Sequence, residues 1–206
     1  MRDIIRMISV VLFVTVSITA FAEGDQVLAT AKGQCISGDK GTQEIQKVLS
    51  ADGVFILVRD EAGKQIWKSE NLGSEDKVFT FEEKGQKLAL KDFTGDGAVE
   101  IITAAFYGPK ASGVYVFTWD PTAKTFKPIM VSAPGDDEPR DLLVSDIRMD
   151  DGSDMIFQKD GKVRLTGMVY PEKPEDAPVG AFYFFEFEKG QFVQKKVEQF
   201  PAEPGK

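Results

Sequence analysis

The chain has 206 residues and a formal net charge of −8, with 33 acidic and 25 basic side chains. Because an acidic protein repels phosphate backbones, this composition argues against nucleic-acid binding. Histidine is absent and cysteine occurs once. The chain therefore lacks the usual general base, the Ser-His and Cys-His nucleophile pairs, and the partner for an internal disulfide bond.

The N-terminus has the pattern of a secretory signal peptide. Arg2 and Arg6 precede a nearly charge-free apolar run at 7–20, and Ala-Phe-Ala at 20–22 has the small-x-small form of a cleavage site. The apolar run is shorter than the roughly 20 residues that a membrane-spanning helix needs. We therefore predict that residues 1–22 are removed on export.

The remainder is predicted to be one domain, residues 23–200, followed by a disordered tail at 201–206. Export would place this domain in the periplasm or outside the cell, with no membrane attachment after cleavage because no second long apolar run follows. Cys35 is expected to be buried and inert, and a cross-link to another chain is the alternative.

Three segments have the composition of similar β-hairpins: 53–67, 113–126 and 180–192. Each opens with glycine, continues through β-branched or aromatic residues, and turns at a polar tip. The first two align without a gap at an offset of 60 residues. These segments favour antiparallel strand pairs that recur along the chain.

A second kind of hairpin precedes two of these segments. Residues 88–92 are expected to pair with 99–106, and residues 142–146 with 155–158 through a turn at 150–152. The fold class is therefore predicted to be all-β, as a twisted antiparallel meander of repeated hairpins. Propeller-like units, a sandwich and a barrel all remain open.

The turn of the hairpin at 88–106 spaces oxygen donors in the manner of a calcium loop. Asp92, Thr94, Asp96 and Glu100 offer side-chain oxygens, and Ala98 offers its carbonyl. Ca²⁺ takes six to eight oxygens at about 2.3–2.6 Å, and a glycine-bearing turn can gather them from alternate residues. The pattern predicts a Ca²⁺ site of modest affinity, and a hairpin turn with solvated charges is the alternative.

A related turn lies at 146–152. Arg148 occupies the position where a third ligand would fall. We therefore expect its cation, rather than a metal, to neutralise Asp146 and Asp150.

Residues 91–106, with their D-x-T-G-D-G-x-x-E loop and following apolar strand, resemble the calcium-loop repeats of VCBS and FG-GAP proteins, the integrin-α-like propeller repeats. The resemblance implies that loop positions 1, 3, 5 and 9 hold Ca²⁺ between strands, in a non-catalytic β module that acts as a binding or interaction protein. This sequence departs from the family in having Thr94 at position 3, Glu100 rather than Asp at position 9, and too few repeats for a seven-bladed ring.

A second resemblance concerns Ser112-Gly113-Val114-Tyr115, which is similar to the S-G-x-Y loop of bacterial periplasmic inhibitors of I-type lysozymes. That resemblance implies that Ser112, Gly113 and Tyr115 form a partner-binding loop, of which Ser112 and Tyr115 insert into the cleft of a basic lysozyme. The chain is longer than those inhibitors usually are. The hairpin pattern instead makes these residues ordinary members of a strand.

Other chemistry has weaker support. Aromatic residues such as Trp67, Trp119, Phe182 and Phe184 could form a sugar-binding platform, but their alternation within strands favours core packing. No two carboxylates stand out as a general acid and base, so an enzyme is not predicted, and a hydrolase with paired carboxylates ranks last. Whether the partner is a protein or a glycan is left open.

Overall fold

A computed structural model describes residues 25–158, 160–171, 173 and 176–200. The predicted signal peptide and the tail at 201–206 lie outside these residues. Strands and their connections make up the described part, as the all-β prediction required. Among the described residues there is no helix with the length and apolar character needed to cross a membrane.

In the described part of the chain the strands form three sheets. The N-terminal sheet contains, in spatial order, β1 (Gln26–Gly33), β2 (Gln43–Ser50), β3 (Gly53–Arg59) and β4 (Gln65–Lys68). The middle sheet contains β5 (Glu75–Asp76), β8 (Leu88–Lys91), β9 (Glu100–Phe106), β10 (Ser112–Asp120), β11 (Thr125–Pro128) and β13 (Leu143–Ser145). The C-terminal sheet contains, in spatial order, β12 (Val131–Ser132), β17 (Gln191–Gln199), β16 (Val179–Glu188), β15 (Val163–Val169), β14 (Met155–Phe157), β6 (Phe79–Phe81) and β7 (Lys84–Gln86).

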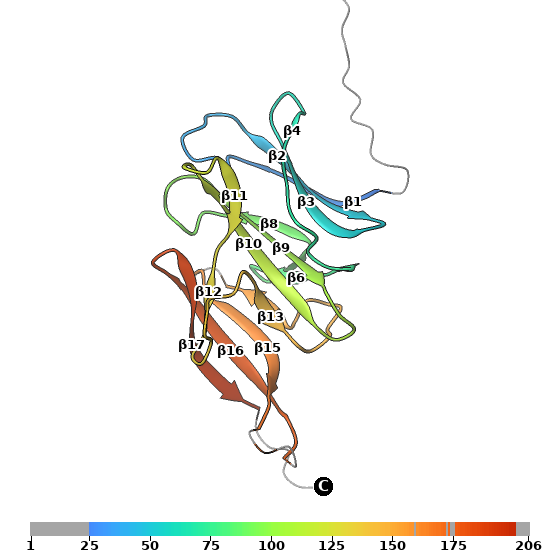
Figure 1. Cartoon of the computed structure of the whole chain (residues 1–206), viewed down its shortest axis with the longest axis vertical. Coiled ribbons are helices and arrows are strands. Elements are labelled where there is room, and N and C mark those ends of the chain that lie inside the picture. Colours follow the sequence, from blue (N-terminus) through green and yellow to red (C-terminus); the bar gives the residue numbers. More distant parts are fainter. Residues whose placement is uncertain (1–24, 159, 172, 174–175, 201–206) are drawn as a thin grey trace, which may run out of the picture.

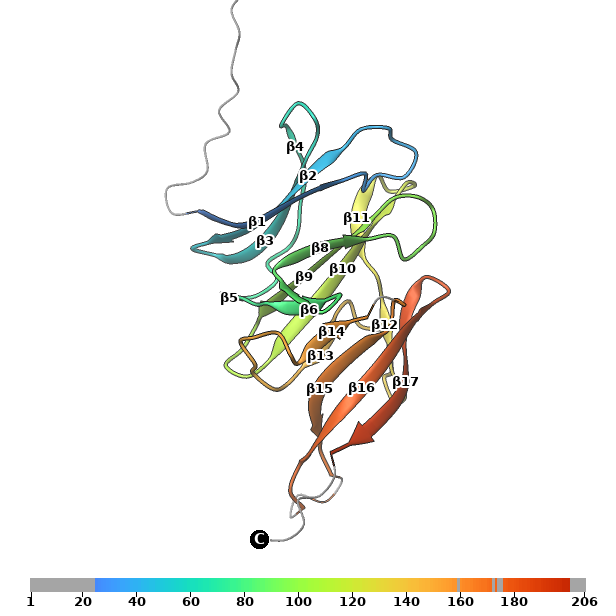
Figure 2. The same cartoon turned by 180° about the vertical axis from the view of Figure 1, so that it is seen from behind.

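The sheets follow one another along the long axis, with the N-terminal sheet at one end and the C-terminal hairpins at the other (Figure 1 and Figure 2). Every residue of β9 is buried, because both faces of the middle sheet are covered. Alternate side chains of a strand point to opposite faces. Ile101 and Ala105 accordingly join the core shared with the N-terminal sheet, whereas Ile102 and Ala104 join the core shared with the C-terminal sheet.

Four predicted hairpins are confirmed. Antiparallel pairs join β3 to β4, β10 to β11, and β16 to β17, which are the three glycine-led segments. The pair β8–β9 is the hairpin that carries the loop at 92–99. None of the sheets formed by the described residues closes on itself, so the barrel alternative does not hold and a meander of packed open sheets does.

The predicted hairpin between 142–146 and 155–158 is wrong. Strand β13 pairs with β10 in the middle sheet, whereas β14 pairs with β15 and, in parallel, with β6 in the C-terminal sheet. The loop between them therefore crosses from one sheet to the next instead of closing a hairpin. The hydrophobic pattern of both strands was correct, but it does not encode which distant strand each one meets.

A buried lysine joins the N-terminal sheet to the middle sheet. The Lys47 ammonium, with 0% of its side chain exposed, lies 2.7 Å from Oδ1 of Asp76 and donates to the carbonyls of Ala104 and Lys77. Lys87 contacts the other oxygen of Asp76 at 2.6 Å. Burial lowers the pKa of Lys47 to about 8, although attraction by Asp76 opposes this shift. The ammonium thus links three strands at a cost in solvation.

Cys35 lies in the core shared by the N-terminal and middle sheets and is 1% exposed. Burial raises the pKa of its thiol to about 12. The prediction of a buried cysteine is therefore confirmed, and the raised pKa supports the expectation of low reactivity, since the thiolate is the reactive form.

Candidate functional site

The loop between β8 and β9 is folded by its own carboxylates. Asp92 accepts hydrogen bonds from the amides of Gly95 at 2.6 Å and Gly97 at 3.1 Å, and Asp96 accepts one from the amide of Ala98 at 2.8 Å. Both glycines have φ in the left-handed region, at 75° and 86°, which favours glycine. The aspartates and glycines of the motif therefore shape the turn, and donation from Ala98 lowers the pKa of Asp96.

Glu100, the last candidate ligand, lies at the start of β9 and is only 2% exposed. Its carboxylate accepts hydrogen bonds from the Phe93 amide at 2.6 Å, the Thr94 hydroxyl at 3.3 Å and the Thr118 hydroxyl at 3.0 Å. These donors are uncharged. Burial raises the pKa of Glu100, and the negative charge of Asp92 adds to the effect against the opposing donors. Burying the ionised Glu100 side chain therefore costs free energy of folding, because its hydrogen-bond donors carry no positive charge.

The donor chemistry of the loop suits a hard cation, because every candidate ligand is an oxygen. The cage is not preformed. Among the residues the structure describes, no group of three or more acidic, histidine or cysteine side chains lies close enough together to hold a metal ion. Asp92 and Asp96 face loop amides instead.

The loop between β13 and β14 repeats the spacing of the first at an offset of 54 residues, with Asp146, Arg148, Asp150 and Asp154 at positions 1, 3, 5 and 9. Asp154 is 0% exposed, like the equivalent Glu100. The sequence interpretation ended this loop at residue 152 and so missed Asp154, which the regular spacing makes visible.

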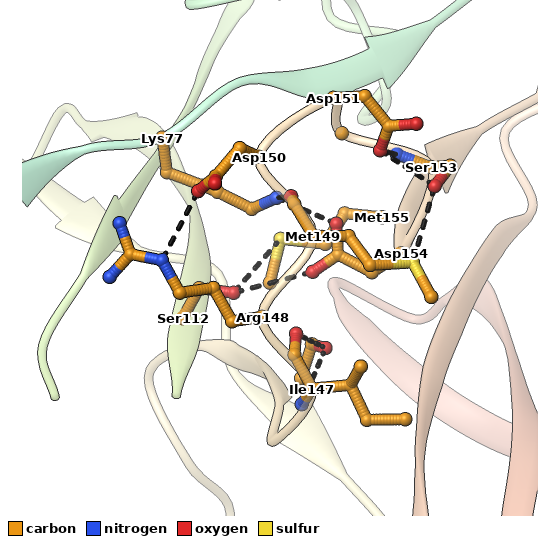
Figure 3. Close-up of polar contacts among 12 residues, drawn as sticks. Lys77, Ser112, Ile147, Arg148, Met149, Asp150, Asp151, Ser153, Asp154 and Met155 are labelled. Atoms are coloured by element: carbon orange, nitrogen blue, oxygen red, sulfur yellow. Dashed lines mark hydrogen bonds and ion pairs between the residues drawn. The ribbon is translucent and has the colours of Figure 1, made fainter. Parts of the chain in front are cut away.

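A lysine from outside the loop neutralises Asp154 (Figure 3). Nζ of Lys77 lies 2.7 Å from Oδ1 of Asp154, and both side chains are fully buried. The same ammonium donates to the carbonyl of Met149 within the loop. The Ser112 hydroxyl lies 3.5 Å from the other oxygen of Asp154. Burial raises the pKa of Asp154, and the bond from Lys77 opposes the shift.

Position 9 of the two loops therefore holds a buried carboxylate in two different electrostatic settings. Asp154 is paired with a protein cation, whereas uncharged donors surround Glu100. Sequence analysis did not find Lys77, since it is 77 residues away from Asp154 in the chain and carries no local signal.

The prediction for Arg148 is half correct. Its Nε lies 3.2 Å from Asp150, as expected, but its second contact is Glu75, at 2.8 Å, rather than Asp146. Asp146 accepts a hydrogen bond from the Met168 amide instead.

Comparison with family models, curated proteins and solved structures gives no match in any of the three. The resemblances to VCBS and FG-GAP repeats and to lysozyme inhibitors therefore remain predictions.

The segment Ser112–Tyr115, predicted as a protruding loop by the second resemblance, lies within β10. Strands β9 and β13 pair with it on either side, so Ser112 and Gly113 are buried. A Cβ at Gly113 would lie 2.4 Å from the Leu142 side chain. The half-buried Tyr115 donates its hydroxyl to the Leu72 carbonyl at 2.8 Å. In this conformation Ser112 and Gly113 are not available for insertion into a lysozyme cleft.

Proposed function

We propose that this chain is an exported, non-catalytic β module that acts as a binding or interaction protein and carries a Ca²⁺-responsive loop at 92–100. The observation that carries the cation proposal is the buried Glu100, held by uncharged donors where the equivalent Asp154 has Lys77. Burying a carboxylate costs free energy unless a positive charge lies nearby. In the second loop the Lys77 ammonium provides that charge to Asp154, and in the first a bound cation would provide it to Glu100.

The residues that would hold Ca²⁺ are those of the motif: the side chains of Asp92, Thr94, Asp96 and Glu100, with the carbonyl of Ala98. The ion would supply positive charge to carboxylates that otherwise repel one another. Because it binds the folded loop better than the unfolded chain, its binding free energy would add to folding stability.

Calorimetric titration of the metal-free protein with Ca²⁺ tests the proposal. We expect one binding event with modest affinity, abolished by Asp96→Ala. Asp150→Ala is the matched control, since Asp150 has the same position in the second loop but pairs with Arg148; it should leave the binding unchanged. No heat in the wild type, or equal affinity in Asp96→Ala, would overturn the assignment.

The signal-peptide pattern of residues 1–22 supports export. Cell fractionation with N-terminal sequencing of the recovered protein tests it. The expected result is a periplasmic or secreted chain that begins at Glu23, and a chain recovered with Met1 inside the cell would reject it.

A further inference from the structure

An aromatic cleft opens where the N-terminal and middle sheets meet, and no residue of the loop at 92–100 lines it. The cavity has a volume of about 360 Å³. It lies along the rim of the core shared by these sheets, and its walls come from β4, β10 and β11. Its aromatic lining consists of Trp67, Tyr115, Phe117 and Phe126.

Strand geometry places these rings together. Tyr115 and Phe117 are alternate residues of β10 and so share a face, with ring planes 3° from parallel and centroids 6.1 Å apart. Trp67 meets them from β4, and its ring centroid lies 5.2 Å from that of Phe117 and 5.1 Å from that of Phe126. Trp67 and Tyr115 are half-buried, so part of this aromatic surface reaches solvent.

The charged groups at the cleft favour a cation. The exposed carboxylates of Glu70 and Asp141 border it. Lys68 also borders it, but its ammonium lies 3.9 Å from the ring centroid of Phe55. Phe55 alternates with the core residues Val54 and Ile56, so it lies on the opposite face of the N-terminal sheet. The basic group is therefore directed away from the cavity.

A second hollow, of about 430 Å³, continues the cleft and shares Asn71, Leu72 and Tyr115 with it. Asp52 adds a further carboxylate there. The combined surface is larger than one side chain requires, and the whole chain carries a net charge of −8. Extent and charge both suit a basic macromolecule rather than a small ion.

We propose that this cleft binds an arginine or lysine side chain of a basic protein partner. The half-buried rings of Trp67 and Tyr115 attract the cation through their quadrupoles, over the buried rings of Phe117 and Phe126. Glu70 and Asp141 supply charge-assisted hydrogen bonds at the rim. The inference rests on the proposed function only in that the module acts by binding. It does not involve the loop at 92–100.

The test is a nuclear magnetic resonance titration of the full chain, because the two tryptophans give separate indole signals and Trp67 lines the cleft. The probes are a capped Gly-Arg-Arg-Gly peptide and its citrulline counterpart, which keeps the side-chain length but lacks the charge. Spermidine and a trimer of N-acetylglucosamine serve as a free polyamine and a glycan.

We expect the arginine peptide to shift the Trp67 indole signal and the citrulline peptide to leave it in place. The double variant Glu70→Gln, Asp141→Asn should lower the affinity for the arginine peptide by about tenfold, because two ion pairs at the rim are lost. Glu83→Gln with Asp137→Asn removes the same charge from exposed positions outside the cleft and should change the affinity by less than about twofold.

Several outcomes would overturn the proposal: equal binding of the citrulline peptide, no weakening in the Glu70 and Asp141 variant, or a Trp67 shift with only spermidine or only the glycan. A protein that binds Ca²⁺ but no probe would reject the cleft while leaving the loop proposal intact. The opposite pattern would reject the loop alone.

Discussion

Lys77 and Asp154 form an ion pair shielded from solvent, with Nζ 2.7 Å from Oδ1 and 0% of either side chain exposed. Lys77 lies between β5 of the middle sheet and β6 of the C-terminal sheet, and Asp154 immediately precedes β14. The pair therefore joins the two segments of the chain that pass from the middle sheet to the C-terminal sheet. Its net contribution to stability is small, because desolvation offsets attraction, but each partner depends on the other.

Asp154→Asn should strongly destabilise the protein, since it leaves the Lys77 ammonium buried without its counter-charge. The expected loss in free energy of unfolding is about 3–5 kcal/mol. Urea denaturation measures it as a lower midpoint. Combining Lys77→Met with Asp154→Leu should recover much of the loss, because the apolar pair carries no desolvation cost.

The matched control for this prediction is Asp160→Asn, which breaks the exposed pair with Lys162 and should leave the midpoint unchanged. An Asp154→Asn variant with the wild-type midpoint would contradict the structural role of the pair.

The lowered pKa of Lys47 predicts that this residue's contribution to the free energy of unfolding rises with pH. Its pKa is lowered from 10.5 to about 8, by burial first, with Asp76 opposing and Lys87 and Lys77 adding to the shift. Between these two values the unfolded chain binds the proton more strongly than the folded protein does. Its contribution to the free energy of unfolding therefore increases as pH rises from about 8 toward 10.5.

The measurement is the urea midpoint from pH 7 to 10 for the wild type and for Lys47→Met. The difference between the two should shift in favour of the wild type above about pH 8. Comparing the proteins cancels other groups, including Cys35, whose raised pKa removes stability above its ordinary value of 9.0. A difference that stays constant over this range would show that Lys47 does not titrate as described.

Glu100→Gln tests the electrostatic cost of the loop in the absence of metal. Because the folded pKa of Glu100 is raised, its charge costs stability as pH rises above the unfolded value of 4.5. A glutamine can still accept from Phe93 and donate to the hydroxyls of Thr94 and Thr118. With chelator at pH 7, the variant should be at least as stable as the wild type, and its stability should vary less with pH.

Thermal unfolding with chelator from pH 4 to 7 provides the measurement. Asp96→Asn is the contrasting variant, because the pKa of Asp96 is lowered and its charge favours folding. If the free energy of unfolding of Glu100→Gln falls by more than about 2 kcal/mol under these conditions, the Glu100 carboxylate stabilises the fold mainly as a hydrogen-bond acceptor and the prediction is contradicted.

The sequence was sufficient for features encoded locally. The strand composition and polar tips of residues 53–67, 113–126 and 180–192 predict hairpins because the pairing partner follows within a few residues. The Asp and Gly spacing at 92–97 likewise predicts a tight turn, since side-chain acceptors and left-handed glycines act within the turn itself.

Features that depend on distant parts of the chain were not predictable. The failed hairpin at 142–158 has strands of the right composition that pair with β10, β6 and β15 instead. Lys77 carries no sign in its own neighbourhood that it will neutralise Asp154. The hairpin pattern predicted that Ser112–Tyr115 belongs to a strand, but its pairing with the distant β13, which makes that strand internal, carries no local signal.

The most direct test of the Ca²⁺ proposal is the melting temperature of the protein, measured in saturating Ca²⁺ and in chelator, for the wild type and Asp96→Ala together. Free Ca²⁺ at 100 times its dissociation constant would stabilise the fold by about 2.7 kcal/mol, which corresponds to about 5–10 °C for a domain of this size. We predict a rise of that order in the wild type and its loss in Asp96→Ala. An unchanged wild-type melting temperature, or the same rise in both proteins, would contradict a cation site in the loop at 92–100.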